Sequence, residues 1–233
     1  MATELLLEIK LLSDATFGRG DGVAGLIDAE VEHDECGLPY LRGRTIKGLL
    51  VEECANLLYA LGTHPALGRL EKTAEQMFGS PGSAAAEMGM LKVGAGTLPE
   101  NFREAVADAV KSGKLTEEEI LTAMTAIRRQ TAVSAKTGAP LKNSLRSMRV
   151  VLRETVFTAP LTLEDGVEFD AEIGCALLAA CVAGLRRGGT GRNRGRGRFA
   201  CRLLDSQGNE LRNCFADFRR IVQSARPEEG ATV

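Results

Sequence analysis

The feature that most constrains this chain is the segment of residues 188–198 (the glycine loop), which reads Gly-Gly-Thr-Gly-Arg-Asn-Arg-Gly-Arg-Gly-Arg. It holds five glycines and four arginines, and no acidic residue occurs between Ile173 and Leu204. Glycine lets backbone N–H groups approach a ligand closely and adopts positive φ angles readily. Arginine adds planar, permanently charged groups that match phosphate oxygens. The segment therefore predicts a binding site for a polyanion.

The surroundings of the glycine loop indicate an ordered connection; a solvated arginine–glycine segment is the alternative interpretation. The small-residue pattern over residues 170–186 predicts a helix before the loop, and residues 198–204 read as a strand after it. A dinucleotide-binding fingerprint needs the reverse order, with the strand before the glycines and the helix after them. The chain also lacks the Gly-x-x-x-x-Gly-Lys-Ser/Thr pattern of a P-loop. Neither of these nucleotide sites is therefore expected.

The net charge of −2 argues on its own against a nucleic-acid partner, but the distribution of charge argues for one. Seven basic residues and no acid lie within residues 128–153, and the same is true of residues 186–202. Two concentrated basic stretches on an otherwise acidic chain suit a protein that binds a phosphate backbone. Because the chain has no tryptophan and only two tyrosines, base stacking is not expected to dominate binding. The alternative is two solvated basic faces.

Cysteine and histidine usage argues against a zinc site. None of the six cysteines forms a Cys-x-x-Cys pair, and the only histidines are His33 and His64. Scattered free cysteines suit a reducing compartment. The first residues lack a basic region, and no run of eighteen apolar residues occurs, so we expect neither a signal peptide nor a membrane span. These observations together predict a cytoplasmic protein without a membrane partner.

Hydrophobic periodicity predicts an α+β fold. Strands are expected over residues 4–13, 86–93, 149–163 (as a strand or hairpin) and 198–204, and helices over 45–61, 99–111, 116–129, 170–186 and 215–224. Without its insertions this order is βαββαβ, the ferredoxin-like (RRM-like) unit. The expected division is a sheet domain of residues 1–95 and 149–225, a helical insertion of residues 96–129, and a projecting arm of residues 130–148. Such sheets often bind RNA, but a fold alone does not establish a function.

Two further segments carry charge in informative places. Arg42, Arg44 and Lys47 lie at the start of the helix that Thr45 is expected to cap. Cations there oppose the helix dipole, which is reasonable if an anion docks on the free N–H groups; surface solubility is the alternative. The loop of residues 14–34 carries six acids, and in Gly25-Leu-Ile-Asp28 apolar neighbours can hold one carboxylate in place. The alternative for Asp28 is a turn-capping carboxylate.

Three stretches together resemble the RAMP superfamily of CRISPR-associated proteins, and in particular the repeated backbone subunit of type III effector complexes. The first runs from Gly25-Leu-Ile-Asp28 through Gly37-Leu-Pro-Tyr-Leu-Arg-Gly-Arg-Thr-Ile-Lys-Gly48. The second is residues 131–146, and the third is the glycine loop before the last strand. They occur in the family's order and span most of the chain. Thr45-Ile-Lys-Gly48 departs from the typical Ser-x-Lys-Gly but keeps the hydroxyl and the lysine.

The resemblance implies a subunit that stacks with copies or paralogues of itself and with other effector subunits along a guide CRISPR RNA. It implies a ferredoxin-like palm and a thumb, the arm of residues 130–148, whose Val133 and Leu141 wedge between bases of the guide–target duplex. It also implies that Asp28 cleaves the complementary target RNA with a divalent metal ion, expected to be Mg²⁺, for which Asp28 is the candidate ligand. Asp21 and Asp34 are weaker candidates. The expected RNA-binding residues are Arg42, Arg44, Thr45, Lys47, Arg129, Lys136, Lys142, Arg146, Gly189, Gly191, Arg192, Arg194 and Arg196.

Two alternatives stay open at the level of sequence. The chain would be a purely structural guide-binding subunit if Asp28 were inert and another subunit cut the target. It would be a standalone endoribonuclease that processes repeat RNA if His33, the only histidine in the acidic loop, were catalytic. All three interpretations predict RNA binding.

Overall fold

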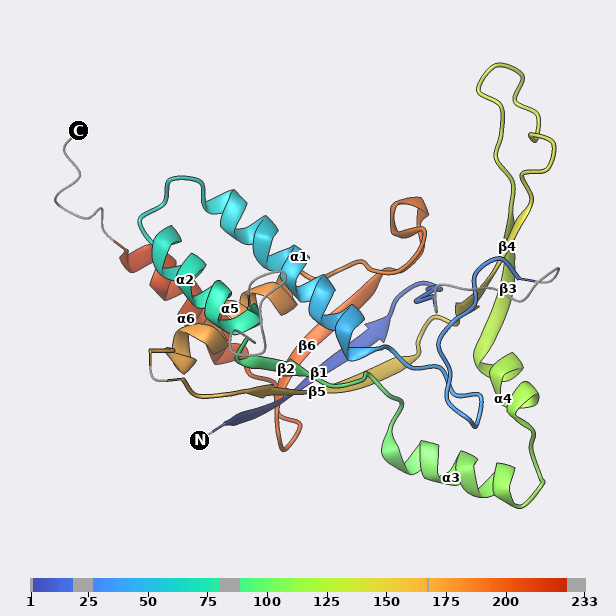
Figure 1. The fold of residues 1–233 in the computed structure, drawn as a ribbon, viewed down its shortest axis with the longest axis horizontal. Coiled ribbons are helices and arrows are strands. Elements are labelled where there is room, and N and C mark those ends of the chain that lie inside the picture. The colour runs from blue at the N-terminus through green and yellow to red at the C-terminus, as the bar shows by residue number, and fades with distance from the viewer. Residues whose placement is uncertain (1, 19–26, 80–88, 167, 226–233) are drawn as a thin grey trace.

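The computed structural model describes residues 2–18, 27–79, 89–166 and 168–225. Its centre is a four-stranded antiparallel sheet with the order β2-β5-β1-β6, built from β1 (Thr3–Leu11), β2 (Leu91–Val93), β5 (Val156–Leu163) and β6 (Phe199–Asp205) (Figure 1). Strand β1 lies between β5 and β6 and runs antiparallel to both. With helices between β1 and β2 and between β5 and β6, this order is the ferredoxin-like arrangement, which confirms the predicted α+β palm.

Strand β1 forms because its sequence alternates. Leu5, Leu7, Ile9 and Leu11 are buried in the main core, while the residues between them point to the other face of the sheet. On that other face the charges are paired: Arg202 of β6 donates to Glu8, and Thr162 of β5 donates to Glu4 at 3.0 Å. One face of the sheet is therefore apolar and covered, and the other is polar.

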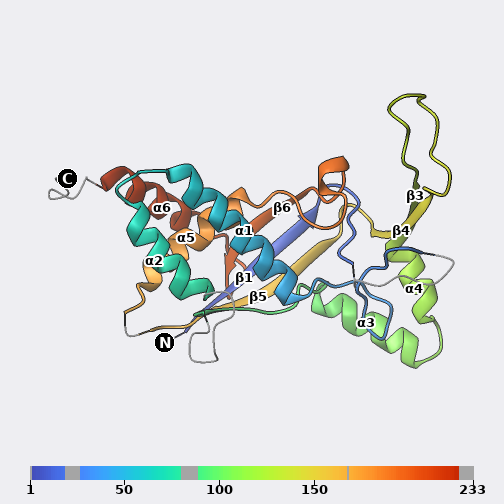
Figure 2. The same ribbon diagram turned by 45° about the horizontal axis from the view of Figure 1, so that its top comes forward.

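Four helices lie on the apolar face: α1 (Gly43–Leu61), α2 (Leu67–Phe78), α5 (Ala171–Gly184) and α6 (Arg212–Ser224) (Figure 2). Asp170 caps α5 by accepting hydrogen bonds from the backbone N–H groups of Glu172 and Ile173. Helix α1 begins at Gly43 with Arg42 at the N-cap, so the predicted cap at Thr45 is wrong. The start is shifted because Gly43 packs against β2, where a Cβ would lie 2.2 Å from the Val93 carbonyl oxygen. Helix α2 was not predicted.

The predicted elements between the two halves of the palm need three corrections. Helix α3 (Glu100–Lys111) is as expected, but α4 (Glu117–Met124) ends well before residue 129 because β3 (Thr125–Gln130) pairs with β4 (Arg146–Val151). The region 149–163 is not one strand or hairpin, since β4 and β5 belong to different sheets. The strand expected over 86–93 covers only Leu91–Val93 among the described residues, and residues 86–88 lie outside them.

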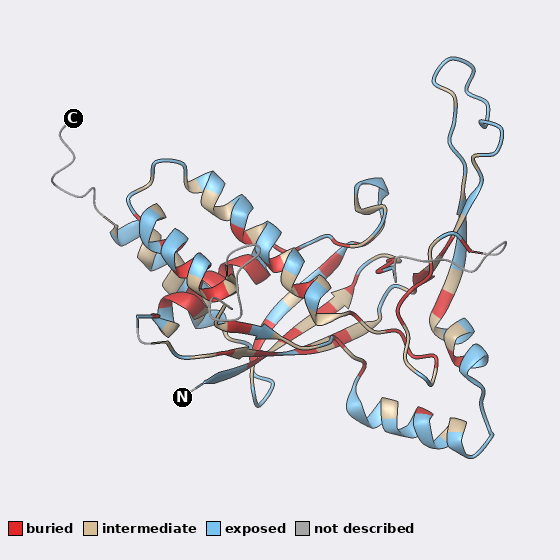
Figure 3. Ribbon diagram, in the orientation of Figure 1, coloured by how far each residue is buried: buried red, intermediate tan, exposed pale blue. Residues whose placement is uncertain are grey.

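The predicted arm projects from the molecule. Strands β3 and β4 form its base, and a bridge between Val133 and Pro140 joins its two sides near the tip. Nearly all of its residues are exposed, with Val133 at 59% and Leu141 at 50% (Figure 3). Within the described ranges, no helix is long and apolar enough to cross a membrane.

Burial keeps two of the cysteine thiols protonated. All six cysteines are free. Burial raises the pKa of the Cys175 thiol to about 12, and burial also raises the pKa of Cys201 to about 12. Thiols with such pKa values are protonated at neutral pH and are poor nucleophiles.

Candidate nucleic-acid interface

Asp28 is fixed at the base of the thumb by a short parallel pairing with β4. Its N–H donates to the Ser147 carbonyl at 2.9 Å, and the Arg149 N–H donates to the Ala29 carbonyl at 3.0 Å. The Ser147 N–H donates to Oδ2 of Asp28 at 2.7 Å. The side chain is exposed all the same. Residues 119 positions apart in the sequence thus hold one carboxylate in place at the surface.

A groove of about 700 Å³ (the Asp28 groove) opens beside this carboxylate. Asp28 and Ala29 form its floor, the base of the thumb forms one wall, and the glycine loop forms the other. The lining residues are Asp28, Ala29, Gln130, Arg146, Ser147, Met148, Gly189, Thr190, Gly191, Arg192, Asn193 and Arg194. A second groove of about 560 Å³ shares Gln130, Arg146 and Arg194 and continues along the thumb to Val133. The two acid-free stretches of the sequence therefore converge beside Asp28.

The structure sorts the predicted RNA-binding residues into two groups. Those that line the Asp28 groove are Arg146, Gly189, Gly191, Arg192 and Arg194. Those that do not line it are Arg42, Arg44, Thr45, Lys47, Arg129, Lys136, Lys142 and Arg196. Sequence reasoning did not single out Gln130, Ser147, Met148, Thr190 and Asn193, which also line it. Their residue types do not indicate RNA binding. They line the groove only because they lie next to the glycine loop and the base of the thumb.

The glycines of the loop are required by the chain's own backbone. Gly189, Gly191, Gly195 and Gly197 all have positive φ angles. A Cβ at Gly197 would lie 1.9 Å from the Gly188 carbonyl oxygen, and one at Gly189 would lie 2.5 Å from the Thr16 carbonyl oxygen. The Thr190 N–H donates to that same Thr16 carbonyl at 2.8 Å. The loop is thus closed on itself and fastened to the segment that follows β1.

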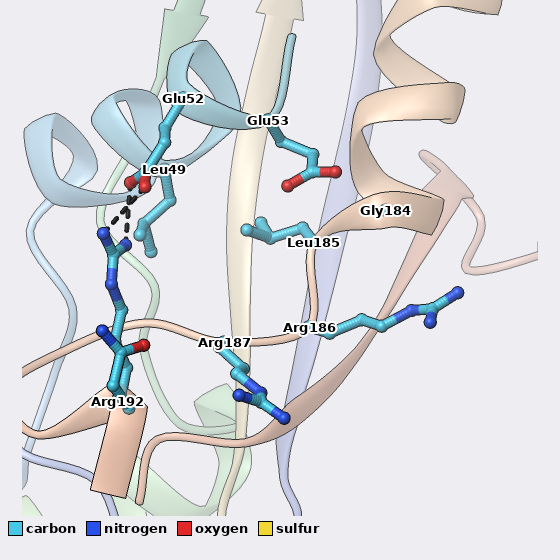
Figure 4. A pocket seen from close by; sticks show the side chains of 9 residues that line it. Leu49, Glu52, Glu53, Gly184, Leu185, Arg186, Arg187 and Arg192 are labelled. Atoms are coloured by element: carbon cyan, nitrogen blue, oxygen red, sulfur yellow. Dashed lines mark hydrogen bonds and ion pairs between the residues drawn. The ribbon is translucent and has the colours of Figure 1, made fainter. Parts of the chain in front are cut away.

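Arg192 is held by an ion pair and does not point freely into the groove. Its guanidinium donates to both carboxylate oxygens of Glu52 on α1, at 2.7 and 2.8 Å (Figure 4). This hydrogen bonding raises the pKa of Arg192 and lowers the pKa of Glu52 from their ordinary values. Arg186 and Arg187 line the same small pocket of about 290 Å³ but point away from Glu52. The glycine loop is therefore tethered to α1.

Acids outside the basic stretches neutralise other arginines as well. Arg128 of β3 donates to Asp14 at 2.7 and 2.9 Å. Arg42 pairs with buried Glu32 at 2.7 Å, and this hydrogen bond raises the pKa of Arg42. In the described part of the chain, the predicted RNA-binding side chains that show no carboxylate within ion-pair distance are Arg44, Lys47, Arg129, Lys136, Lys142, Arg146, Arg194 and Arg196. Of these, Arg146 and Arg194 line the Asp28 groove.

The sequence was compared with models of known protein families. The model of the RAMP superfamily matches residues 8–200. The chain belongs to the RAMP superfamily. No curated protein matches it significantly.

Solved structures share the fold of this RAMP protein. A chain of the type III-B Cmr-beta complex bound to cognate target RNA superposes with a TM-score of 0.56 at 11% identity, over 87% of this chain and 97% of that one. A chain of the apo type III-B Cmr-beta complex gives a TM-score of 0.59 at 12% identity, over 88% of this chain and 98% of that one. At such identities the likeness concerns the fold alone.

Asp34 and His33 of the acidic loop make contacts within the fold and do not line the Asp28 groove. Oδ1 of Asp34 accepts hydrogen bonds from the backbone N–H groups of Cys36 and Leu38, at 2.9 and 3.0 Å, and so caps a turn. His33 is largely buried, lies 3.5 Å from Glu117, and does not line the Asp28 groove. Asp21, Gly25 and Leu26 lie outside the described residues. Asp28 is therefore the carboxylate that the described groove presents.

A metal site does not form from protein ligands alone in the described residues. No group of three or more His, Cys, Asp or Glu side chains is arranged there to hold a metal ion. Asp28 supplies at most one carboxylate, and Mg²⁺ commonly takes one or two carboxylates and completes its shell with waters and substrate phosphates. Waters and RNA phosphates would complete the shell of an Mg²⁺ ion bound at Asp28.

Proposed function

We propose that this RAMP protein is a guide-RNA-binding backbone subunit of a type III CRISPR effector complex, and that Asp28 is the catalytic residue that cleaves complementary target RNA. The observation that carries the proposal is the Asp28 groove. It brings one exposed carboxylate, two arginines that have no carboxylate partner among the described residues, and a backbone-rich glycine loop to the foot of a projecting hairpin. A ribonucleotide strand is the ligand that uses all four.

The partners follow from the fold that the chain shares. The Cmr-beta complexes are type III-B assemblies, and one was solved with cognate target RNA. By that likeness we expect a guide CRISPR RNA, a complementary target RNA, other effector subunits and further copies or paralogues of this chain. Arg146 and Arg194 would bind phosphates as planar guanidinium groups, and the exposed Val133 and Leu141 of the thumb would separate neighbouring bases.

Cleavage requires a general base near the 2′-hydroxyl. Oδ2 of Asp28 is engaged by the Ser147 N–H, which leaves Oδ1 to accept the 2′-hydroxyl proton. The 2′-oxygen then attacks the adjacent phosphorus to form a 2′,3′-cyclic phosphate, and the 5′-oxygen of the next nucleotide leaves and takes a proton from water. A thumb that displaces a base distorts the backbone and can bring these three atoms into line. A positioned base contributes roughly 10²–10⁴-fold to such a reaction.

The proposal includes a divalent metal ion, expected to be Mg²⁺, bound together with the RNA. When bound, such an ion stabilises negative charge on phosphate oxygens. Cleavage should then stop when EDTA is added and return with excess Mg²⁺. Cleavage that is unchanged in EDTA would remove the metal from the proposal and leave Asp28 as the base.

The deciding experiment compares reconstituted complexes that contain Asp28→Ala, Asp28→Asn or unaltered subunits, with a guide and a labelled target RNA. Both variants should abolish cleavage by this subunit while target binding persists, because the backbone hydrogen bonds of Asp28 and Ala29 with β4 do not involve the carboxylate. Asp217→Asn on α6, a surface ion pair with Arg220, is the matched control. If cleavage survives at every position, the chain is a structural guide-binding subunit. Cleavage of unprocessed repeat RNA by the lone protein would favour a processing enzyme instead.

A further inference from the structure

Three acids of the loop alternate along an extended segment, two with partners on β4 and one with a partner at the start of α1. Asp28 binds Ser147 of β4, Glu30 binds Arg149 of β4, and Glu32 binds Arg42 at the start of α1. Glu30 and Glu32 are buried, at 3% and 5% exposure. The segment thus links the foot of the thumb to the palm through charged groups, two of which lie in the interior.

Glu30 and Arg149 form a satisfied ion pair in the interior. Nε of Arg149 donates to Oε1 of Glu30 at 2.8 Å, and Nη1 donates to Oγ1 of Thr125, the first residue of β3, at 3.2 Å. The side chain of Glu30 is 4% exposed and that of Arg149 is 16% exposed. Buried Thr16, in the segment after β1, donates to the Arg149 carbonyl at 2.8 Å. Arg149 therefore joins both thumb strands and two palm segments.

The spacing couples this pair to the carboxylate in the groove. Glu30 lies two residues after Asp28, and Arg149 lies two residues after Ser147, so the two contacts are successive rungs of one parallel pairing. In extended chains a slip of one residue turns every side chain to the opposite face. A slip here would turn Asp28 away from the groove and bring an alanine or isoleucine into its place.

Packing alone does not explain a charged pair at this position. Removing two charges from water costs free energy that their attraction only roughly repays, and apolar pairs of similar size are often as stable. The best-attested use of buried polar pairs is to fix one register among several. The Glu30–Arg149 ion pair can form in only one register of the two segments. Such a pair is useful where the nearby Asp28 carboxylate must be held in one position.

We propose that Glu30 and Arg149 are positioning residues for the cleavage reaction, because they lock the register that presents Asp28 to the scissile phosphate. The inference rests on the proposed function of Asp28. It assigns to the pair no contact with RNA, since neither residue lines the Asp28 groove. It predicts that loss of the pair slows the chemical step and leaves target binding nearly unchanged.

The test uses reconstituted complexes with Glu30→Gln, Arg149→Lys and the double variant Glu30→Met with Arg149→Met. The double variant replaces the charges with an apolar pair, so it should fold about as stably as the unaltered chain. All three should lower the cleavage rate at saturating target by roughly 10–100-fold, the usual effect of a misplacement of about 1 Å. The dissociation constant of target RNA should change by less than about threefold. The control is Arg202→Lys, which alters the ion pair with Glu8 on the open face of the sheet.

A second readout does not depend on catalysis. Hydrogen exchange of the Ser147 and Arg149 amides reports the pairing of this segment with β4, because these groups donate to the Asp28 carboxylate and the Ala29 carbonyl. Exchange at both should accelerate in the variants and not in the control. Unchanged exchange, or an apolar double variant that cleaves at the normal rate, would overturn the inference. If Asp28→Ala still cleaves while the variants accelerate exchange, the register role stands and the proposed catalytic role of Asp28 fails.

Discussion

The two walls of the Asp28 groove are built in opposite ways. The glycine loop is fastened at its neck by Gly188 and Gly197, at its side by Thr16, and near its tip by the pair of Arg192 with Glu52. The thumb is fastened only at its base: almost every residue from 131 to 145 is exposed, and in the described part of the chain the hydrogen bonds of these residues stay within the hairpin. The first wall can hold a phosphate at a fixed distance from the palm, and the second can adjust to what it touches.

Among substitutions in the glycine loop, we expect one at Gly197 to destabilise the protein most. Its φ of +63° and the short approach to the Gly188 carbonyl leave no room for a side chain. Gly197→Ala should lower the free energy of unfolding by roughly 2–4 kcal/mol. Gly195→Ala is the matched control, because Gly195 also has a positive φ but has open space around it. It should cost only about 1–2 kcal/mol, and urea denaturation measures both. Equal losses would show that the loop is not closed on itself.

The unpaired arginines of the two walls should contribute more to RNA binding than the paired one. Arg146→Ala and Arg194→Ala should each weaken binding of any guide sequence by roughly tenfold, because each removes a charged hydrogen bond to phosphate. Each should also flatten the slope of log K against log salt by about 0.7–0.9. Arg192→Ala should change the slope less, since Glu52 already neutralises that arginine. If Arg192→Ala changes the slope of log K against log salt more than the other two variants do, Arg192 is the main phosphate contact and the prediction is wrong.

The tether of the loop wall depends on the charge of Glu52. Arg192 lowers the pKa of this carboxyl, so the stabilisation is present above the ordinary glutamate pKa and is lost as the pH falls through the lowered value. Because Glu52 is 50% exposed, the effect on the melting temperature should be small. Glu52→Gln should instead increase hydrogen exchange in residues 188–198 at neutral pH and match the unaltered chain once the pH falls below the lowered pKa of Glu52. Equal exchange at neutral pH would mean that the pair does not restrain the loop.

The thumb wall should show the smallest effect on stability. Val133→Ser and Leu141→Ser change side chains that are at least half exposed, so the free energy of unfolding should stay within about 0.5 kcal/mol. If the thumb separates bases, the double variant should blur the spacing of the target cleavage products while the guide remains bound. Gel analysis of labelled target measures this spacing. If the double variant still gives evenly spaced cleavage products, residues other than Val133 and Leu141 separate the bases.

Much of the fold could be predicted from local pattern because periodicity and capping act within a few residues. The alternation of Leu5 to Leu11 predicts β1 and its buried face, and the capping box of Thr116 and Glu119 predicts the start of α4. The end of α4 could not be predicted in this way. Thr125 leaves the helix because Val151, far along the chain, pairs with it. Tertiary pairing there overrides a helical pattern that continues to residue 129.

The amino-acid sequence by itself determined β1, most of the helices, the two acid-free stretches and the glycines that a closed loop needs. Only the tertiary structure decided that these stretches meet beside Asp28, and that Arg192 has a carboxylate partner while Arg146 and Arg194 have none among the described residues. The reason is physical: a backbone preference is local, whereas the partner of a charge is whichever group the packing brings within a few ångströms. Glu52 and Arg192 are 140 residues apart, and no short-range pattern contains both.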